Sequence, residues 1–430
     1  MRPATIVPFL LSLAVWGFGV GASAEELPPV RQITHGPKFH WFGYYDKLEF
    51  DPTSRYVLAN EVDFEGRSPK ADDVIRVGMI DLEDHDRWID LGESHAWSWQ
   101  QGCMLQWRPG SKSQIAWNDR EGDRHVCRVL DVFTRRRRTI PFPIYALSPD
   151  GRHAIGADFR RIQDHRPGYG YAGLSDPCKA EARPADSGVW SVDLETGATR
   201  LIISIAQAAA IPYENGDPDE FATSSHWFNH LLYNTDGTRL LFLHRWRPAA
   251  DSKYARKYAG VGGFGTRMFT ANADGSGLYV LDPYGKTSHF VWRDSRTVTA
   301  WAWHPSDGSR FYDFKDRTRE VSVVGRDVMA INGHNTYLAR MDNAWILCDT
   351  YPDAKRLQHP YLYHVPTNRR IPLGHFTSPP AYSGEWRCDT HPRSDPSGTK
   401  VVIDSPHNGG RQLYLIDISR IVAPKTAQMP

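Results

Sequence analysis

One short turn pattern recurs seven times along this chain, and the recurrence limits the possible folds more than any other feature of the sequence. In each copy an apolar or aromatic residue ends a short run, a polar turn follows, and a run typical of a β-strand comes next. The turns lie at residues 50–53, 107–110, 147–151, 233–237, 292–295, 337–340 and 394–398. Asp, Pro and Gly in such turns favour tight connections between antiparallel strands.

Most copies continue into a second hairpin, for example around the turn Glu195-Thr196-Gly197. Four strands in each of seven units predict an all-β, single-domain fold, a seven-bladed β-propeller with four-stranded antiparallel blades. The last unit lacks an outer strand, which residues 30–34 are expected to supply. A set of independent β-sandwiches is the rival fold, but it does not explain turns that recur in register. Residues 201–211 are the only helix candidate.

The first 24 residues have the parts of a secretory signal peptide: a charged start, an apolar run and the small-residue cleavage site Ala22-Ser23-Ala24. Residues 25–430 are then expected to form the propeller domain, periplasmic or secreted, without a membrane span. The 51 Lys and Arg residues balance the 50 Asp and Glu residues, which argues against a nucleic-acid partner. Five cysteines are too few for a disulfide scaffold, although one or two disulfides remain open.

Alignment of the seven turns brings one position into register, four residues before the second residue of each turn. In a propeller this position lies at the start of each innermost strand, so its residues surround the central channel. They are Lys47, Met104, Ile144, His230, His289, His334 and His391. Histidine in four successive blades favours function over chance, because only 18 of the 430 residues are histidine. Converging imidazoles are typical of zinc and transition-metal sites.

A second ring is predicted ten residues after the same reference, where the second strand returns to the same face. Its members are Glu61, Asn118, Asp158, His244, Trp303, Cys348 and Ser405. Long connections leave this ring and are expected to wall a cleft. Asn118, Arg120 and Arg245, in or beside the ring, are candidate substrate-binding residues.

Several features have a simpler interpretation or argue against other functions. Taken singly, His226, His304 and His407 are best read as hydrogen-bonded structural residues. The sequence has no Gly-x-Ser-x-Gly elbow and no His-Glu-x-x-His helix, which disfavours a propeller peptidase and a zinc protease. Acidic pairs are weak in both rings, so hydrolysis by two carboxylates is not favoured. Further residues near the first ring are alternative metal ligands: Cys348, Asp349, Cys388 and Asp389.

The stretch from His230 to His289 resembles the oligogalacturonate lyases, seven-bladed propellers that cleave uronic-acid oligosaccharides by β-elimination. The matching motifs are Phe242-Leu243-His244, Thr266-Arg267-Met268-Phe269, Asn272-Ala273-Asp274-Gly275, Ser288-His289-Phe290-Val291-Trp292, Gly333-His334 and Asp389-Thr390-His391-Pro392. A broader likeness extends to the ulvan lyases. The resemblance implies that His244 is the general base and that His289 and His391 bind a metal. Asp389 stands where the family has a second ligating histidine, and the family's glutamine ligand is missing.

β-Elimination of a uronide requires a neutralised carboxylate, a base for the C5 proton and an acid for the leaving oxygen. In this hypothesis His244 is the base, Arg267 pairs with the carboxylate and Tyr45 protonates the leaving group. A divalent cation (manganese, zinc or calcium) is held by the ring, with His230 as a fourth ligand or proton relay. Its predicted ligands are His289, His334, His391 and Asp389. The expected partner is an acidic polysaccharide or oligosaccharide.

Two other classes of function stay open at this point. A non-catalytic periplasmic scaffold accounts for the signal peptide and the repeats, but not for the histidines. A metal-assisted glycan hydrolase uses the same ring to activate water. The sequence leaves the oligomeric state undecided.

Overall fold

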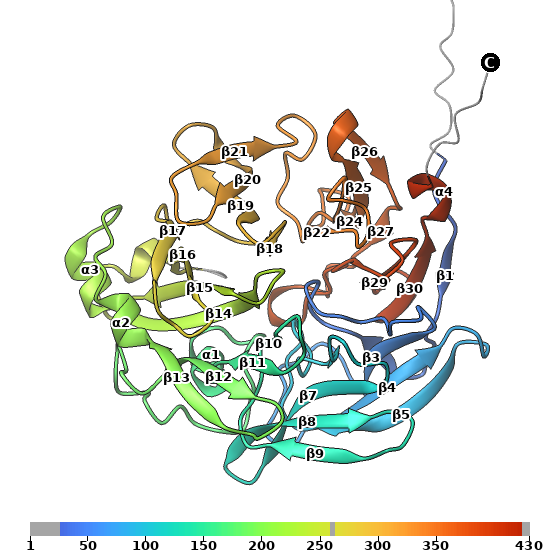
Figure 1. Ribbon diagram of the computed structural model, residues 1–430, viewed down its shortest axis with the longest axis horizontal. Coiled ribbons are helices and arrows are strands. Elements are labelled where there is room, and N and C mark those ends of the chain that lie inside the picture. Colours follow the sequence, from blue (N-terminus) through green and yellow to red (C-terminus); the bar gives the residue numbers. More distant parts are fainter. Residues whose placement is uncertain (1–25, 259–262, 424–430) are drawn as a thin grey trace, which may run out of the picture.

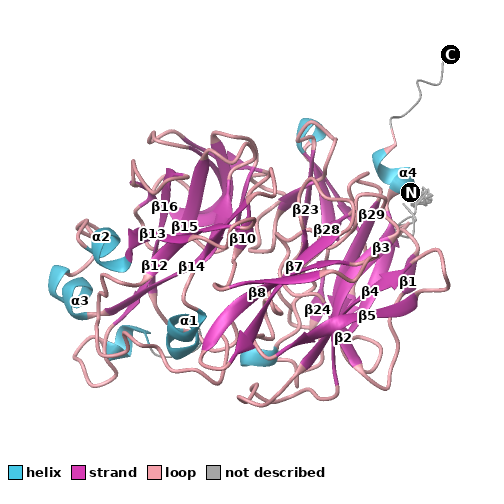
Figure 2. Cartoon of the chain, turned by 60° about the horizontal axis from the view of Figure 1, so that its bottom comes forward, coloured by secondary structure: helices cyan, strands magenta, loops and turns pink. Residues whose placement is uncertain are grey.

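The computed structural model describes residues 26–258 and 263–423, and these form seven four-stranded antiparallel sheets around a common centre (Figure 1). The predicted seven-bladed β-propeller is therefore confirmed. The predicted signal peptide, residues 1–24, lies outside the described residues. Strands dominate the molecule, and its few helices are short (Figure 2).

The chain builds blades 1 to 6 in order, each from the innermost strand outward, and only blade 7 takes its outermost strand from the other end of the described chain. Blade 1 consists of β2 (Phe39–Trp41), β3 (Tyr56–Val62), β4 (Ile75–Asp81) and β5 (Arg87–Ser94). Blade 2 consists of β6 (Gln106–Trp107), β7 (Gln114–Glu121), β8 (Arg124–Asp131) and β9 (Arg137–Ile140). Blade 3 consists of β10 (Ala146–Leu147), β11 (His153–Gly156), β12 (Gly188–Asp193) and β13 (Thr199–Ser204). Blades 4 and 5 consist of β14 (Ser225–Tyr233), β15 (Arg239–Arg247), β16 (Gly265–Asn272) and β17 (Tyr279–Asp282); and β18 (Phe290–Trp292), β19 (Thr297–His304), β20 (Gly308–Lys315) and β21 (Val321–Val324).

Blade 6 consists of β22 (Thr336–Tyr337), β23 (Trp345–Cys348), β25 (Tyr361–His364) and β26 (Arg369–Pro372), and a separate two-stranded sheet joins β24 (Leu357–Gln358) to β27 (Phe376–Thr377). Blade 7 consists of β28 (Arg393–Ser394), β29 (Lys400–Ser405), β30 (Gln412–Asp417) and β1 (Val30–Gln32).

The N-terminal strand closes the ring, as the sequence predicts. Val30 pairs with Ile416 and Gln32 with Tyr414, in antiparallel register. The Thr34 hydroxyl then donates to Gln412 Oε1 at 2.6 Å. The first described strand therefore fastens the last blade.

The recurring turn residues explain the repeat in the sequence. Asp51 Oδ1 accepts hydrogen bonds from the backbone N–H groups of Arg55 and Tyr56, at 2.8 and 2.7 Å. Asp395 does the same in blade 7, with Thr399 and Lys400, both at 2.8 Å. One acceptor side chain thus holds the start of the second strand in each of these two blades.

The helix expected over residues 201–211 is only partly correct. Residues up to Ser204 belong to β13, and the helix α2 spans Ile205–Ala209. Ser204 and Gln207 form a capping box that fixes this later start. The other helices are α1 (Phe159–His165), α3 (Pro218–Thr223), α4 (Ser419–Val422) and the 3-10 turns η1 (Ala255–Tyr258), η2 (Val365–Thr367) and η3 (Gly384–Trp386). None of the helices in the described residues is long and apolar enough to cross a membrane.

Apolar side chains of neighbouring blades pack against each other. One cluster joins Val189 and Ile203 of blade 3 to Phe242 and Phe269 of blade 4. The polar side chains at the start of the inner strands are left around the centre of the ring, which is where the candidate site lies.

Candidate functional site

Three ring histidines converge at the centre of the propeller. The ring centroids of His289 and His334 are 4.1 Å apart, and those of His334 and His391 are 4.2 Å apart. All three side chains are buried. His391 has a φ of 38°, in the left-handed region that non-glycine residues seldom adopt. Such strained backbone often marks a functional site.

His334 and His391 are held by one buried carboxylate. Asp349 Oδ1 accepts from the backbone N–H of His334 at 2.7 Å and lies 2.9 Å from its ring Nδ1. Asp349 Oδ2 accepts from the backbone N–H of His391 at 3.2 Å and from the Thr390 hydroxyl at 2.6 Å. Gly333 allows this approach, since a Cβ there would lie 1.9 Å from the Asp349 carbonyl oxygen. Asp349 is therefore an orienting group.

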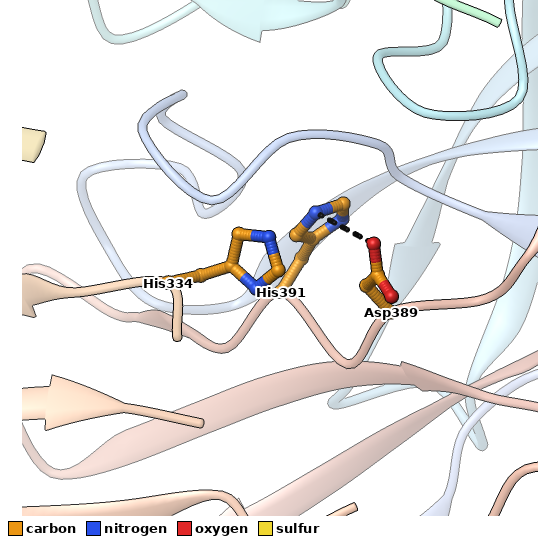
Figure 3. A group of neighbouring side chains, drawn as sticks. All are labelled: His334, Asp389 and His391. Atoms are coloured by element: carbon orange, nitrogen blue, oxygen red, sulfur yellow. Dashed lines mark ion pairs between the residues drawn. The ribbon is translucent and has the colours of Figure 1, made fainter. Parts of the chain in front are cut away.

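This arrangement leaves two imidazole nitrogens with nothing to bind. Among the described residues, Nε2 of His334 and Nε2 of His391 are buried without a hydrogen-bond partner. Both rings lie beside the Asp389 carboxylate, whose Oδ2 is 3.9 Å from His391 Nε2 (Figure 3). One potential ligand atom from each of the three residues lies within 4.8 Å of the others. Orphaned buried polar atoms facing a carboxylate fit a divalent metal ion.

His289 lies beside this group but is engaged on both sides. Its Nδ1 is 3.0 Å from Asn332 Oδ1, and its Nε2 is 3.3 Å from the Tyr351 hydroxyl. The three-residue group that can hold a metal in the described chain does not include His289. The predicted ligands His334, His391 and Asp389 are thus brought together, whereas His289 packs against them.

Asp389 is in turn fixed by an arginine. Arg387 Nε donates to Asp389 Oδ2 at 2.7 Å, and Arg387 Nη2 donates to the Tyr169 hydroxyl at 2.7 Å. Tyr169 belongs to the long connection of blade 3, so this loop reaches the centre of the ring, as predicted for a wall of the site.

Two consecutive tyrosines project into the ring and have different environments. The Tyr45 hydroxyl donates to the Phe290 carbonyl at 2.9 Å and accepts from the Phe290 N–H at 3.0 Å. Tyr44 stacks on His230 with centroids 5.0 Å apart and meets His391 edge-on at 5.1 Å. No hydrogen bond of the described residues involves the Tyr44 hydroxyl. The hydroxyl of Tyr45, the predicted acid, is thus engaged by the Phe290 backbone, whereas that of Tyr44 is not engaged.

Tyr44 was not among the predicted site residues, although its position close to the first ring could have indicated it. It lies three residues before the ring position Lys47, in the segment His40–Asp46 that matched no motif. Lys47 itself is paired with Asp46 at 2.8 Å, which leaves the aromatic rings of the segment at the centre.

His230 connects the tyrosines to a loop arginine. Its Nε2 is 3.1 Å from Arg166 Nη1, and its backbone N–H donates to the Tyr145 hydroxyl at 2.9 Å. Burial, then the charges of Arg166 and Lys47, holds the pKa of His230 well below its ordinary value. The ring is therefore neutral, with Nε2 accepting from Arg166 and Nδ1 3.4 Å from both Gln101 Nε2 and the Tyr145 hydroxyl.

His244 and Arg267 occupy a different environment from the one expected of a base and a substrate-binding arginine. His244 Nε2 is 2.8 Å from His226 Nδ1, and Arg267 Nε donates to His244 Nδ1 at 3.3 Å. The rest of the Arg267 guanidinium donates to the carbonyls of Ala208, Ile211 and Pro212, at 2.8, 2.7 and 2.9 Å. These bonds close the end of α2. Both residues are engaged by side chains of blade 4 and by the carbonyls at the end of α2.

Two of the three candidate substrate-binding residues are engaged by other parts of the protein, and the third has unpartnered atoms. Asn118 is buried and joins two blades, because it donates to the Ile144 carbonyl at 2.7 Å and accepts from the Ile144 N–H at 2.8 Å. Arg120 donates to the Ala71 carbonyl of a neighbouring loop. Arg245, by contrast, is buried with Nε and Nη1 unpartnered among the described residues.

The cysteines form no disulfide in the part of the chain that the structure describes. Cys348 and Cys388 are buried and free, and burial raises the pKa of both thiols. The structure places neither in the metal-binding group.

Comparisons with known proteins identify relatives by fold alone. No protein-family model matches the chain, and no curated protein matches its sequence. An oligogalacturonate lyase from Vibrio parahaemolyticus has a similar structure, with a TM-score of 0.60 and 16% identity over 90% of this chain and 93% of that one. An oligogalacturonate lyase in complex with manganese gives a TM-score of 0.63 and 14% identity over 93% and 95%. The likeness in fold to the oligogalacturonate lyases is thereby confirmed. The likeness to the ulvan lyases stays a prediction.

Proposed function

We propose that this protein is a polysaccharide lyase that cleaves a uronic-acid-containing glycan by β-elimination. The observation that carries the proposal is the pairing of a metal-binding group, His334, Asp389 and His391, with a free tyrosine hydroxyl on the stacked pair Tyr44–His230. The shared fold of two oligogalacturonate lyases, one of them in complex with manganese, supports it.

His334, Asp389 and His391 would hold the divalent cation. When bound, such a cation neutralises the substrate carboxylate and stabilises the charge that develops next to it. Asp349 holds the ring of His334 and the backbone of His391, and Arg387 holds Asp389. These groups keep the ligand atoms in place before substrate arrives.

The chain's own side chains move the protons. Nε2 of His230 takes the C5 proton of the uronide as Arg166 turns from this nitrogen to the substrate carboxylate, and Tyr44 gives its proton to the departing oxygen at C4. The C5–H bond electrons form the C4–C5 double bond as the C4–O bond breaks. Base and acid lie next to each other, because the two rings are stacked with centroids 5.0 Å apart. Arg166 beside His230 is positioned to attract the anionic substrate.

A panel of uronic-acid polysaccharides, assayed with and without added manganese, zinc or calcium, tests the proposal. We expect ultraviolet absorbance of the unsaturated product to rise together with reducing ends, and chelator to abolish both. Reducing ends without absorbance would indicate a metal-assisted hydrolase instead. Absence of both products, in a protein that binds no metal, would favour the non-catalytic scaffold.

We propose further that residues 1–24 direct export to the periplasm or the medium. Fractionation of cells that produce the full chain, with mass determination of the product, tests this point. We expect cleavage after Ala24, and an uncleaved cytoplasmic product would contradict it.

A further inference from the structure

Three arginines surround one phenylalanine close to the candidate site. Their guanidinium carbons lie 4.3 Å (Arg245), 5.0 Å (Arg166) and 5.9 Å (Arg247) from the centre of the Phe264 ring. None of the three forms an ion pair with a carboxylate of the described residues. Residues 259–262, outside the described part, read Ala-Gly-Val-Gly and contribute no acidic side chain. The positive charges therefore have no anionic partner within this part of the protein, although Arg247 Nε donates to the Gly263 carbonyl at 2.8 Å.

Three other buried arginines of this propeller have a carboxylate partner. Arg161 pairs with Asp176 at 2.9 Å, Arg239 with Asp316 at 2.7 Å, and Arg393 with Glu49 at 2.8 Å. A buried guanidinium without such a partner is costly. Arg245, only 3% exposed with two unpartnered nitrogens, departs from this rule. A missing anionic partner accounts for the departure.

Neutral groups on the same sheet face are unpartnered as well. Trp227 of β14 pairs directly with Arg245 of β15, so their side chains lie on one face, and Asn229 follows two residues later on that face. The indole N–H of Trp227 and both amide atoms of Asn229 are buried with no partner in the described residues. Two buried donors beside unpaired guanidinium groups suit a ligand with several oxygen acceptors.

We propose that Arg166, Arg245 and Arg247, with Asn229, form a second anion subsite that binds a carboxylate or sulfate carried by a sugar. This inference rests on the proposed function and narrows the substrate to glycans with at least two anionic groups. One group belongs to the sugar at the metal-binding residues, and the other to a neighbouring sugar. Arg166 links the two places, because its Nη1 lies 3.1 Å from His230 Nε2.

Titration calorimetry on the mature protein in chelator separates this subsite from metal binding and turnover. The probes are trigalacturonate, the same trimer with its carboxylates reduced to alcohols, and a sulfated neutral trisaccharide. We expect binding of an anionic trimer and at least about ten-fold weaker binding by Arg245→Gln, since a paired guanidinium contributes strongly to anion affinity. The preferred anion distinguishes carboxylate from sulfate.

Arg369→Gln, at an exposed position on the outer strand β26, is the matched control and should bind like the wild type. Arg247→Gln, at a half-buried position, repeats the test if Arg245→Gln does not fold. Unchanged affinity in the folded variants, equal binding of the reduced trimer, or no binding of any anionic trimer would overturn the subsite. Binding that depends on Arg245 without any unsaturated product would retain the subsite and reject the lyase.

Discussion

The Asp349 carboxylate lies 2.9 Å from Nδ1 of His334 and also accepts the backbone N–H of that histidine, at 2.7 Å. This double contact fixes the ring plane and directs Nε2 toward His391 and Asp389. Partners of this kind orient the histidine ligands of metal sites and raise their basicity. The contact connects the fold to the chemistry, because Asp349 follows directly after β23 while His334 precedes β22.

Asp349→Asn should weaken metal binding without unfolding the protein. The amide cannot accept all the hydrogen bonds that the carboxylate now receives, so the ring of His334 loses its fixed orientation. Loss of such a partner typically lowers metal affinity by about 10- to 100-fold. Titration of the metal-free protein with manganese measures the change, and Asp63→Asn, at an exposed position, is the control. Equal affinity in the two variants would contradict an orienting role.

His391→Ala should remove the effect of metal on stability. A cation that binds only the folded state at about 100 times its Kd adds about 2.7 kcal/mol to the free energy of unfolding. The wild type and the exposed control His35→Ala should both show this rise in thermal unfolding with added manganese. A rise of the same size in His391→Ala would show that the metal binds elsewhere in the protein.

Tyr44→Phe should lower turnover, whereas Tyr45→Phe should lower stability. Tyr44→Phe removes the free hydroxyl, and loss of a general acid lowers kcat by about 10²- to 10⁴-fold. Tyr45→Phe removes two hydrogen bonds to Phe290, each contributing about 1 kcal/mol to stability, and should leave kcat close to the wild type. Product absorbance and chemical denaturation measure the two effects. Loss of turnover in Tyr45→Phe alone would restore the original choice.

His230→Asn and His244→Asn distinguish the two candidate bases. Loss of a general base lowers kcat by about 10²- to 10⁴-fold, and we expect this of His230→Asn. His244→Asn breaks the contacts with His226 and Arg267, so a lower unfolding temperature is expected with little change in kcat. If His244→Asn folds normally and loses turnover, the base is His244, as the family resemblance implies.

The sequence predicted the parts of this protein that repeat. Turn residues such as Asp51 and Asp395 recur because each holds the start of a strand, and their register placed His334 and His391 in one ring. Side chains that act through non-repeating contacts could not be found in this way. Tyr44 enters the ring from an irregular segment, and Arg166 reaches His230 from the end of a helix within a long connection.

Position in the second ring was also a poor guide to availability. His244 and Asn118 occupy the expected strands, but hydrogen bonds to neighbouring groups engage both side chains. Such partners come from neighbouring strands of the same blade and from an adjacent blade, and no periodicity predicts them. A ring position therefore predicts where a residue lies and not whether its polar atoms are free.

The buried ring of His125 should make the propeller less stable in mild acid. Burial chiefly lowers the pKa of His125 to about 4, and its Nε2 has no hydrogen-bond partner among the described residues. A histidine whose pKa is lower in the folded state stabilises the protein above its unfolded pKa of about 6.5. This contribution is lost at about 1.4 kcal/mol per pH unit as pH falls from about 6.5 toward 4. His125→Phe keeps the edge contact with Tyr171. Its free energy of unfolding should rise relative to that of the wild type by about 1.4 kcal/mol for each pH unit over this range. Denaturant unfolding of both proteins at about pH 7 and about pH 5 measures the difference. A difference that does not change with pH would show that His125 is not the group that titrates.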